Sequence, residues 1–182
     1  MMKSIVLIRF SPRNLGNSAA IAAKITKQYE HAQVLNFIAN TSACGNCNYE
    51  CLTAGQVCPN LDENQKRIMD AVCNANLVYF IVPNYCGYPC ASYFAFNERS
   101  VGYFNMNREL MQKYMSVPKR FIIISNSEGD NFKNAMMQQV NEEPDILYMK
   151  TGKYKKRSIA GDMMDSEEAQ ADLEAFLCNH SY

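Results

Sequence analysis

Short apolar runs alternate with amphipathic stretches along this chain. A continuous apolar run of four to six residues is typical of a strand buried on both faces of a parallel sheet. Apolar residues spaced three or four apart indicate one face of a helix instead. The pattern predicts five strands, at residues 5–8, 34–38, 77–82, 121–124 and 146–149.

Helical patterns occupy the intervals between these strands. Residues 17–29 carry apolar side chains at a spacing of four. A capping box is a polar residue followed three positions later by Glu or Gln, and it predicts helix starts at Asp62 with Gln65 and at Asp165 with Glu168. The aromatic-rich segment after the third strand is expected to be helical in parts. A further helical face is formed by Phe132, Met136 and Val140.

Strands that alternate with helices predict an α/β fold with a doubly wound, five-stranded parallel sheet and helices on both faces. We expect one domain over residues 1–182, with a cysteine-rich loop at about residues 40–61. In such sheets ligands bind outside the carboxyl ends of the strands, near the point where the strand order reverses. The loops that follow the strands are therefore where functional residues are expected.

Composition and charge exclude several classes of partner. The formal net charge is zero, so no overall field attracts the chain to nucleic acid or to an anionic membrane. The first apolar run is only about four residues long, much shorter than a signal-peptide core or a membrane span. We expect a cytoplasmic protein with no nucleic-acid or membrane partner. The locally basic run at residues 150–157 is expected to be mainly a solvated connection.

The loop after the first strand has the residues of an anion-binding site. Ser11 and Ser18 can donate hydroxyl hydrogen bonds, Arg13 offers a charged fork, and Gly16 lets the backbone approach a ligand closely. The following helix start adds N–H groups that have no partner within the helix, together with the positive end of its dipole. The alternative is a polar loop in which Asn17 or Ser18 only caps the helix.

Two further loops follow the third and fourth strands, and all three are expected to converge on one edge of the sheet. The second supplies Tyr85 and a backbone stiffened by Pro83, which suits a flat heterocycle, and the loop at residues 125–129 supplies amides and hydroxyls. Both Gly-x-Gly-x-x-Gly and Gly-x-x-x-x-Gly-Lys-Ser/Thr are missing from the sequence, which argues against a dinucleotide or a nucleoside triphosphate. The three loops together predict a site for flavin mononucleotide (FMN).

These motifs resemble those of the NAD(P)H-dependent FMN reductases, and most of all the iron-sulfur flavoproteins. The resemblance covers about residues 1–129 and rests on Ser-Pro-Arg-x-x-Gly-Asn-Ser, Cys-Gly-x-Cys, Pro-x-Tyr-x-Gly and Asn-Glu-Arg. It implies a flavodoxin-like fold, bound FMN, NAD(P)H as co-substrate, and a homodimer or homotetramer. By position it implies phosphate contacts from Ser11, Arg13, Asn17 and Ser18, flavin-ring contacts from Pro83, Asn84, Tyr85 and Gly87, and a looser match at Ser127 and Gly129.

Four of the eight cysteines lie close together, as Cys44-x2-Cys47-x3-Cys51-x6-Cys58 followed by proline. This tight spacing is closer to a ferredoxin run than to paired zinc knuckles, and it favours a 4Fe-4S cluster. Cys51 departs from the family pattern, because three residues separate it from Cys47 where the family usually has two. Zinc and unmetallated thiols therefore remain alternatives.

The sequence as a whole predicts an FMN-dependent oxidoreductase. In such enzymes the flavin supplies the chemistry, and the protein binds and tunes it. Hydride would come from NAD(P)H, and the electrons would leave to an unidentified acceptor, with or without a 4Fe-4S cluster between. No side chain is assigned as a catalytic acid or base. The alternatives are a flavodoxin-type electron carrier without NAD(P)H activity of its own and a zinc-stabilised binding module.

Overall fold

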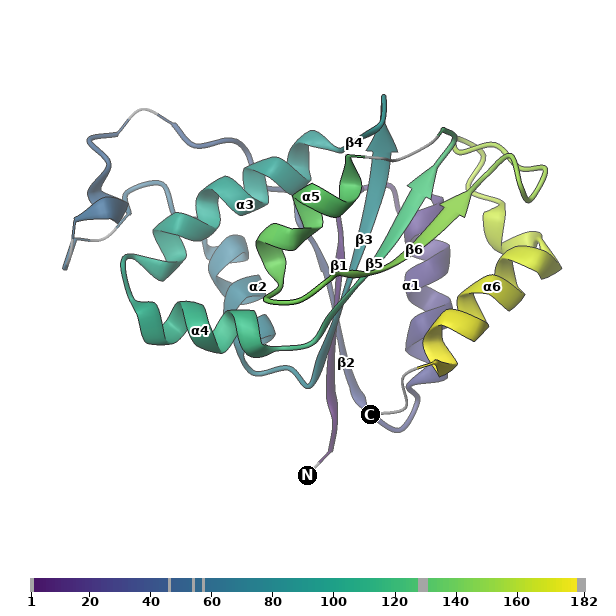
Figure 1. Ribbon diagram of the computed structural model, residues 1–182, viewed down its shortest axis with the longest axis horizontal. Helices are drawn as coiled ribbons and strands as arrows, with labels where there is room; N and C mark the ends of the chain where they lie inside the picture. The colour runs from purple at the N-terminus through teal and green to yellow at the C-terminus, as the bar shows by residue number, and fades with distance from the viewer. Residues whose placement is uncertain (1, 46, 54, 57, 128–130, 180–182) are drawn as a thin grey trace.

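A parallel sheet forms the centre of the structure (Figure 1). The computed structural model describes residues 2–45, 47–53, 55–56, 58–127 and 131–179. The strands run in the order β2-β1-β3-β5-β6, and every pair along this path is parallel. All five predicted strands are confirmed, as β1 Ser4–Arg9, β2 Gln33–Ile38, β3 Leu77–Tyr85, β5 Lys119–Ser125 and β6 Asp145–Lys150.

This order is that of flavodoxin-like sheets, and it reverses between β1 and β3. Helices cover both faces, as predicted, with α1 and α6 on one side and α2, α3, α4 and α5 on the other (Figure 1). The described helices are α1 Asn17–Gln28, α2 Glu63–Cys73, α3 Ala91–Phe104, α4 Arg108–Ser116, α5 Phe132–Met136 and α6 Glu167–Cys178.

The alternation of side chains along β1 divides the core into two layers. Val6 and Ile8 face α2 and α3, whereas Ile5 and Leu7 face α1 and α6. Every residue of β5 is buried, and the apolar run at residues 121–124 is the pattern that identified this strand. Burial on both faces therefore explains why the central strands β1, β3 and β5 could be recognised in the sequence.

Phe10 explains why the aromatic-rich segment forms α3. Its ring, just after β1, packs against Phe80 of β3 and against Tyr93 and Phe96 of α3, with ring centres 5.3 to 5.8 Å apart. Aromatic residues are poor helix formers by intrinsic propensity, but here burial in a shared cluster outweighs that preference. The same cluster holds α3 under the carboxyl edge of the sheet.

Several local expectations are corrected. Asp62 does cap α2 by accepting a hydrogen bond from the Gln65 N–H at 2.6 Å. The Gln65 side chain is instead buried, where it accepts from the Thr41 hydroxyl and donates to the Phe96 carbonyl, so the reciprocal half of the capping box is not formed. Ser166, not Asp165, caps α6 by accepting from the Ala169 N–H.

Other elements differ from the pattern or were not predicted. The helix expected through residue 140 ends at Met136 and continues as the 3-10 turn Met137–Gln139. Helix α4 has only one buried residue, Tyr114, which explains its weak apolar pattern. The two-residue strand β4, Tyr88–Pro89, pairs antiparallel with the end of β3. None of the helices in the described part of the chain is long and apolar enough to cross a membrane.

Candidate functional site

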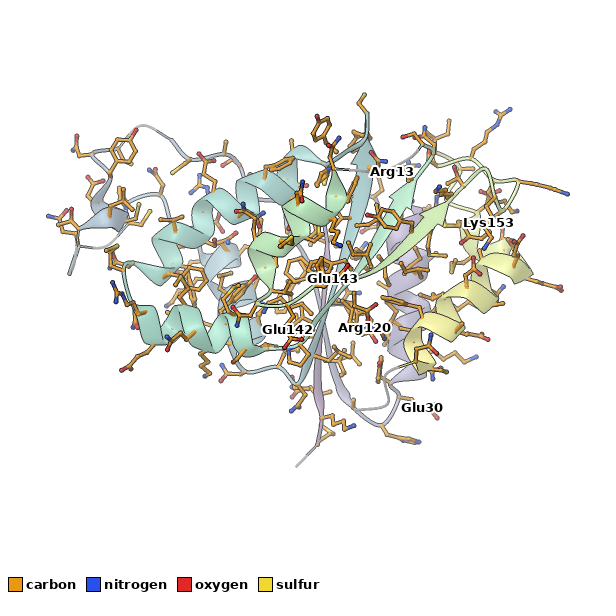
Figure 2. All side chains as sticks on the ribbon, in the orientation of Figure 1. Arg13, Glu30, Arg120, Glu142, Glu143 and Lys153 are labelled. Atoms are coloured by element: carbon orange, nitrogen blue, oxygen red, sulfur yellow. The ribbon has the colours of Figure 1, made fainter. Side chains whose placement is uncertain are left out.

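A cavity of about 430 Å³ lies at the carboxyl edge of the sheet, where β1, β3 and β5 end. Its volume falls within the usual range of small-molecule sites. Figure 2 shows Arg13 at this edge, beside the ends of the strands. Nine predicted site residues line the cavity together: Ser11, Arg13, Gly16, Asn17, Ser18, Pro83, Asn84, Tyr85 and Ser127.

The start of α1 lines this cavity and has no side-chain cap. Gly16 is the N-cap residue, in extended conformation, and α1 has no acidic residue in its first turn. The alternative in which Asn17 or Ser18 caps the helix is therefore wrong. Both side chains are buried at the helix start, and nothing in the first turn neutralises the positive end of the helix dipole. This geometry suits an anion.

The segment that follows the basic run closes one side of the cavity. Ser158 and Ile159 line it, and the Arg13 guanidinium Nη2 donates to the Ile159 carbonyl at 2.6 Å. The Asn17 side chain donates to the Ser158 carbonyl at 3.2 Å and accepts from the Met163 N–H at 3.0 Å. Asn17 thus ties two loops together, and a phosphate contact from its side chain remains a prediction.

Two lysines of the basic run form ion pairs with carboxylates. Lys153 pairs with Asp172 of α6 at 2.5 Å, and Lys156 pairs with Asp162 at 3.3 Å. Figure 2 shows Lys153 beside α6. Such solvent-exposed pairs stabilise little individually, and the Lys153 pair holds the run against α6. The sequence did not indicate these pairs, because the spacing between two charges along a loop does not determine whether they meet.

Asn84 joins the second and third loops of the site. Its buried side-chain amide donates to the hydroxyl of Ser125 at 2.6 Å, and its side-chain oxygen accepts from the Gly87 N–H at 2.9 Å. The Ser127 N–H in turn donates to the Ser125 hydroxyl at 3.0 Å. Asn84 therefore fixes the spacing between the ends of β3 and β5, in addition to lining the cavity.

A hairpin forms the outer wall of the cavity where the sequence predicted only a loop. Cys86 and Gly87 lie at its tip with φ of 53° and 86°, between the paired residues Tyr85 and Tyr88. Two left-handed residues are what a tight two-residue hairpin requires, and glycine adopts this conformation readily. Gly87 thus shapes the turn without lining the cavity, whereas Cys86 and the 65% exposed Tyr85 line it.

One predicted site residue is not described by the structure, and one cysteine near the cavity is buried. Gly129 lies outside the described residues, as do its neighbours at 128 and 130. Cys90 is buried and donates to the Phe10 carbonyl at 3.5 Å, and burial raises the pKa of its thiol. Burial and a raised pKa are typical of a packing cysteine rather than of a reactive one. Ile124 and Asn126 also line the cavity and were not predicted, since they differ in no way from ordinary strand-end residues.

Three of the four clustered cysteines surround a second cavity, of about 650 Å³. Cys44, Cys47 and Cys51 line it together with Glu98 of α3. Burial is the main cause that raises the pKa values of Cys44 and Cys51, and the neighbouring thiols, Cys58 included, raise them further. Across the described residues, no three His, Cys, Asp or Glu side chains stand ready to hold a metal ion. The cluster prediction therefore stays a prediction.

The cysteine segment lies along α3 rather than over the ends of the strands (Figure 1). It leaves the sheet after β2 and returns at α2, with the 3-10 turn Glu50–Leu52 at its far end. Among the described residues, the two cavities share no lining residue, and α3 lines only the second one.

A third cavity, of about 370 Å³, lies at the opposite edge of the sheet and is lined by Arg120, Glu142 and Glu143 (Figure 2). Arg120 is fully buried and donates to Asp145 at 2.6 Å and to the Phe176 carbonyl at 2.5 Å. These bonds join β5, β6 and α6. The amino-terminal edge is not where ligands bind in this type of sheet, so we assign this region a structural role.

Several solved structures have a fold similar to that of this chain. The Trp repressor binding protein of Bacillus subtilis is similar at a TM-score of 0.63 and 14% identity, covering 98% of this chain and 99% of that one. An NADH:FMN oxidoreductase in its apo form matches at 0.55 and 13%, covering 99% and 91%. An azoreductase from Bacillus anthracis matches at 0.53 and 13%, covering 97% and 95%.

These identities are low, so the similarity shows a shared flavodoxin-like fold. No family model matches the chain, and no curated protein matches its sequence.

Gly161 tests how closely the 158–163 segment approaches the loop after β1. Its φ is +79°, and an added Cβ would lie 2.2 Å from the Leu15 carbonyl oxygen. We expect Gly161→Ala to lower the free energy of unfolding by more than about 1 kcal/mol, because backbone strain and a clash with backbone act together. Urea denaturation measures this change.

Gly152→Ala is the matched control, since an added Cβ at Gly152 meets nothing within 4 Å. It should leave stability unchanged or raise it by up to about 1 kcal/mol. Equal effects of the two substitutions would show that the segment does not contact the Leu15 backbone.

Proposed function

We propose that this protein is an FMN-dependent oxidoreductase that takes hydride from NAD(P)H and passes the electrons to an acceptor. The observation that carries the proposal is the convergence of nine predicted residues from three loops on one cavity. Two of the similar structures are named as an NADH:FMN oxidoreductase and an azoreductase, which supports the same reaction class. The family resemblance of the loop motifs adds to this support.

Within the site, the chain's own groups divide into two roles. The uncapped start of α1, the hydroxyls of Ser11 and Ser18 and the remaining N–H groups of Arg13 would hold the FMN phosphate. Pro83 and Tyr85 would border the flavin ring, with the exposed Tyr85 on the side open to a nicotinamide. The chemistry that FMN supplies when bound is acceptance of hydride from NAD(P)H and release of electrons singly or as a pair.

We further propose that Cys44, Cys47, Cys51 and Cys58 hold a 4Fe-4S cluster. Soft thiolates suit iron-sulfur clusters, and the 650 Å³ cavity is much larger than one ion needs. The Asn60 amide nitrogen is also buried without a hydrogen-bond partner in the described part of the chain. Such a donor suits the sulfur atoms of a cluster. The chemistry that the cluster supplies is transfer of single electrons.

The wider assignments follow from composition and family resemblance. Thiols that must stay reduced for a cluster favour the cytoplasm. The resemblance favours a homodimer or homotetramer, and we propose an electron acceptor of unidentified chemistry as the remaining partner. Because the net charge is zero, we propose no nucleic-acid or membrane partner.

FMN titration of the purified protein tests the site directly. We expect FMN to bind more tightly than riboflavin, which lacks the phosphate. Arg13→Ala should weaken FMN binding by about ten- to a hundredfold, equivalent to about 1.5 to 3 kcal/mol for one charge-assisted contact. Arg157→Ala removes the same charge from an exposed position that does not line the cavity, and it should leave affinity unchanged. Failure of wild-type protein to bind FMN would overturn the proposal.

Anaerobic addition of NADH or NADPH to the FMN-loaded protein separates an oxidoreductase from an electron carrier. We expect the flavin absorbance to bleach without any second protein, because the exposed Tyr85 side of the cavity admits a nicotinamide. Bleaching that requires an added reductase would identify a flavodoxin-type carrier instead.

Metal and sulfide analysis tests the cluster. Protein prepared anaerobically should contain about four iron and four sulfide per chain. Cys51→Ala should lose most of the iron and keep FMN, whereas Cys178→Ala, at an exposed position on α6, should keep both. Stoichiometric zinc would identify a structural metal site, and neither metal after anaerobic reconstitution would leave a flavin reductase with unmetallated thiols.

A further inference from the structure

One face of α3 is turned toward the cysteine segment. Glu98, Val101 and Gly102 are spaced so that they share one side of the helix, and Glu98 and Val101 line the 650 Å³ cavity with three of the cysteines. We refer to these three residues as the α3 face. The fourth cysteine, Cys58, does not line the cavity but contacts the same face at Gly102.

Gly102 is unusual because nothing in the backbone requires glycine. It lies inside α3, is buried, and is not among the residues with positive φ. Glycine at an interior helix position costs about 1 kcal/mol relative to alanine. An added Cβ would lie 2.8 Å from the Cys58 Sγ and 3.0 Å from its Cβ. The missing side chain is therefore a notch that admits the Cys58 thiol.

The other end of the cysteine segment is bound to the same helix through backbone groups. The Cys44 N–H donates to the Glu98 carboxylate at 2.9 Å. Next to Glu98, the Arg99 guanidinium donates to the Ser42 carbonyl at 2.6 Å and to the Ala43 carbonyl at 3.0 Å. These three bonds fix the backbone that leads into the first cysteine of the segment.

The two attachments lie about one helical turn apart, which is about 6 Å along α3. A rigid helix thus sets the distance between the first and last cysteines of a segment in which the described residues form the 3-10 turn Glu50–Leu52 and no longer helix or strand. We propose that the α3 face, with Arg99, is a template that positions Cys44 and Cys58 for metal binding. Gly102 is the steric determinant of Cys58, and Glu98 and Arg99 are positioning residues for Cys44.

This inference rests on the proposed metal centre, but thiol accessibility tests it without any metal. In reduced, metal-free full-length protein, iodoacetamide labelling of each cysteine is followed by peptide mass spectrometry. We expect Gly102→Ala to speed labelling of Cys58 by about tenfold or more, because overpacking of one methyl group displaces the thiol from its notch. Labelling of Cys178 on α6 is the internal control and should not change.

Gly152→Ala serves again as the matched control, since its added Cβ meets nothing within 4 Å. Gly102→Ala improves helix propensity, so loss of the helix is not expected, and circular dichroism checks this. An unchanged labelling rate at Cys58 would overturn the role of Gly102, whatever the metal content proves to be.

Glu98 is tested by separating its hydrogen bond from its charge. Glu98→Gln keeps an oxygen that can accept from the Cys44 N–H, so reconstituted iron content should equal that of the wild type. Loss of a negative charge beside the cavity should move the midpoint potential of the cluster to a more positive value. Glu98→Ala removes the acceptor and should reduce iron content and speed labelling of Cys44.

The two proposals fail in different ways. Wild-type protein that takes up no iron overturns the cluster, while labelling of Cys44 and Cys58 still decides whether the α3 face holds them. Full iron content in Gly102→Ala and Glu98→Ala, with wild-type labelling rates, would overturn the template and leave the cluster intact.

Discussion

The alignment of the carboxyl ends of β1, β3 and β5 is the constraint on which the site depends. Parallel pairing in register brings three loops to one edge, although they are far apart in the chain. Asn84 then spans the second and third loops, and Phe10 anchors the first through an aromatic cluster. Because the strands are buried on both faces, the edge is rigid enough to present polar groups at fixed spacing.

The side of the cavity formed by the loop after β1 depends on a contact between distant segments. The loop after β1 would be open to solvent on its outer side, but Ser158 and Ile159 close it and use donors from Arg13 and Asn17. The ion pairs of the basic run hold this segment toward α6. Arg13 therefore supports the wall of the cavity through one N–H group, and in the proposed function its other N–H groups would be left for the phosphate.

Helix α3 connects the two regions where chemistry is proposed. At its start, the Cys90 thiol and the Ser92 hydroxyl donate to the Phe10 carbonyl beside the first loop. Toward its end, the α3 face holds the cysteine segment. One helix therefore contacts the loop after β1 near its start and the cysteine segment toward its end.

The sequence by itself determined the five strands, the parallel fold and most of the residues that line the cavity at the carboxyl edge of the sheet. It could do so because burial on both faces produces apolar runs, and because ligand residues follow strands of this kind directly. Local signals were less certain, as Ser166 shows by capping α6 in place of Asp165. Alternative caps one residue apart differ only slightly in free energy, and packing decides between them.

Only the tertiary structure decided which distant segments meet. The contacts of Arg13 with Ile159, of Gly161 with Leu15 and of Cys58 with Gly102 join residues that no local pattern relates. The sequence showed four closely spaced cysteines, but not that a glycine in α3 makes room for one of them. Steric complementarity of this kind depends on the packed positions of two segments, and hydrophobic periodicity carries no information about it.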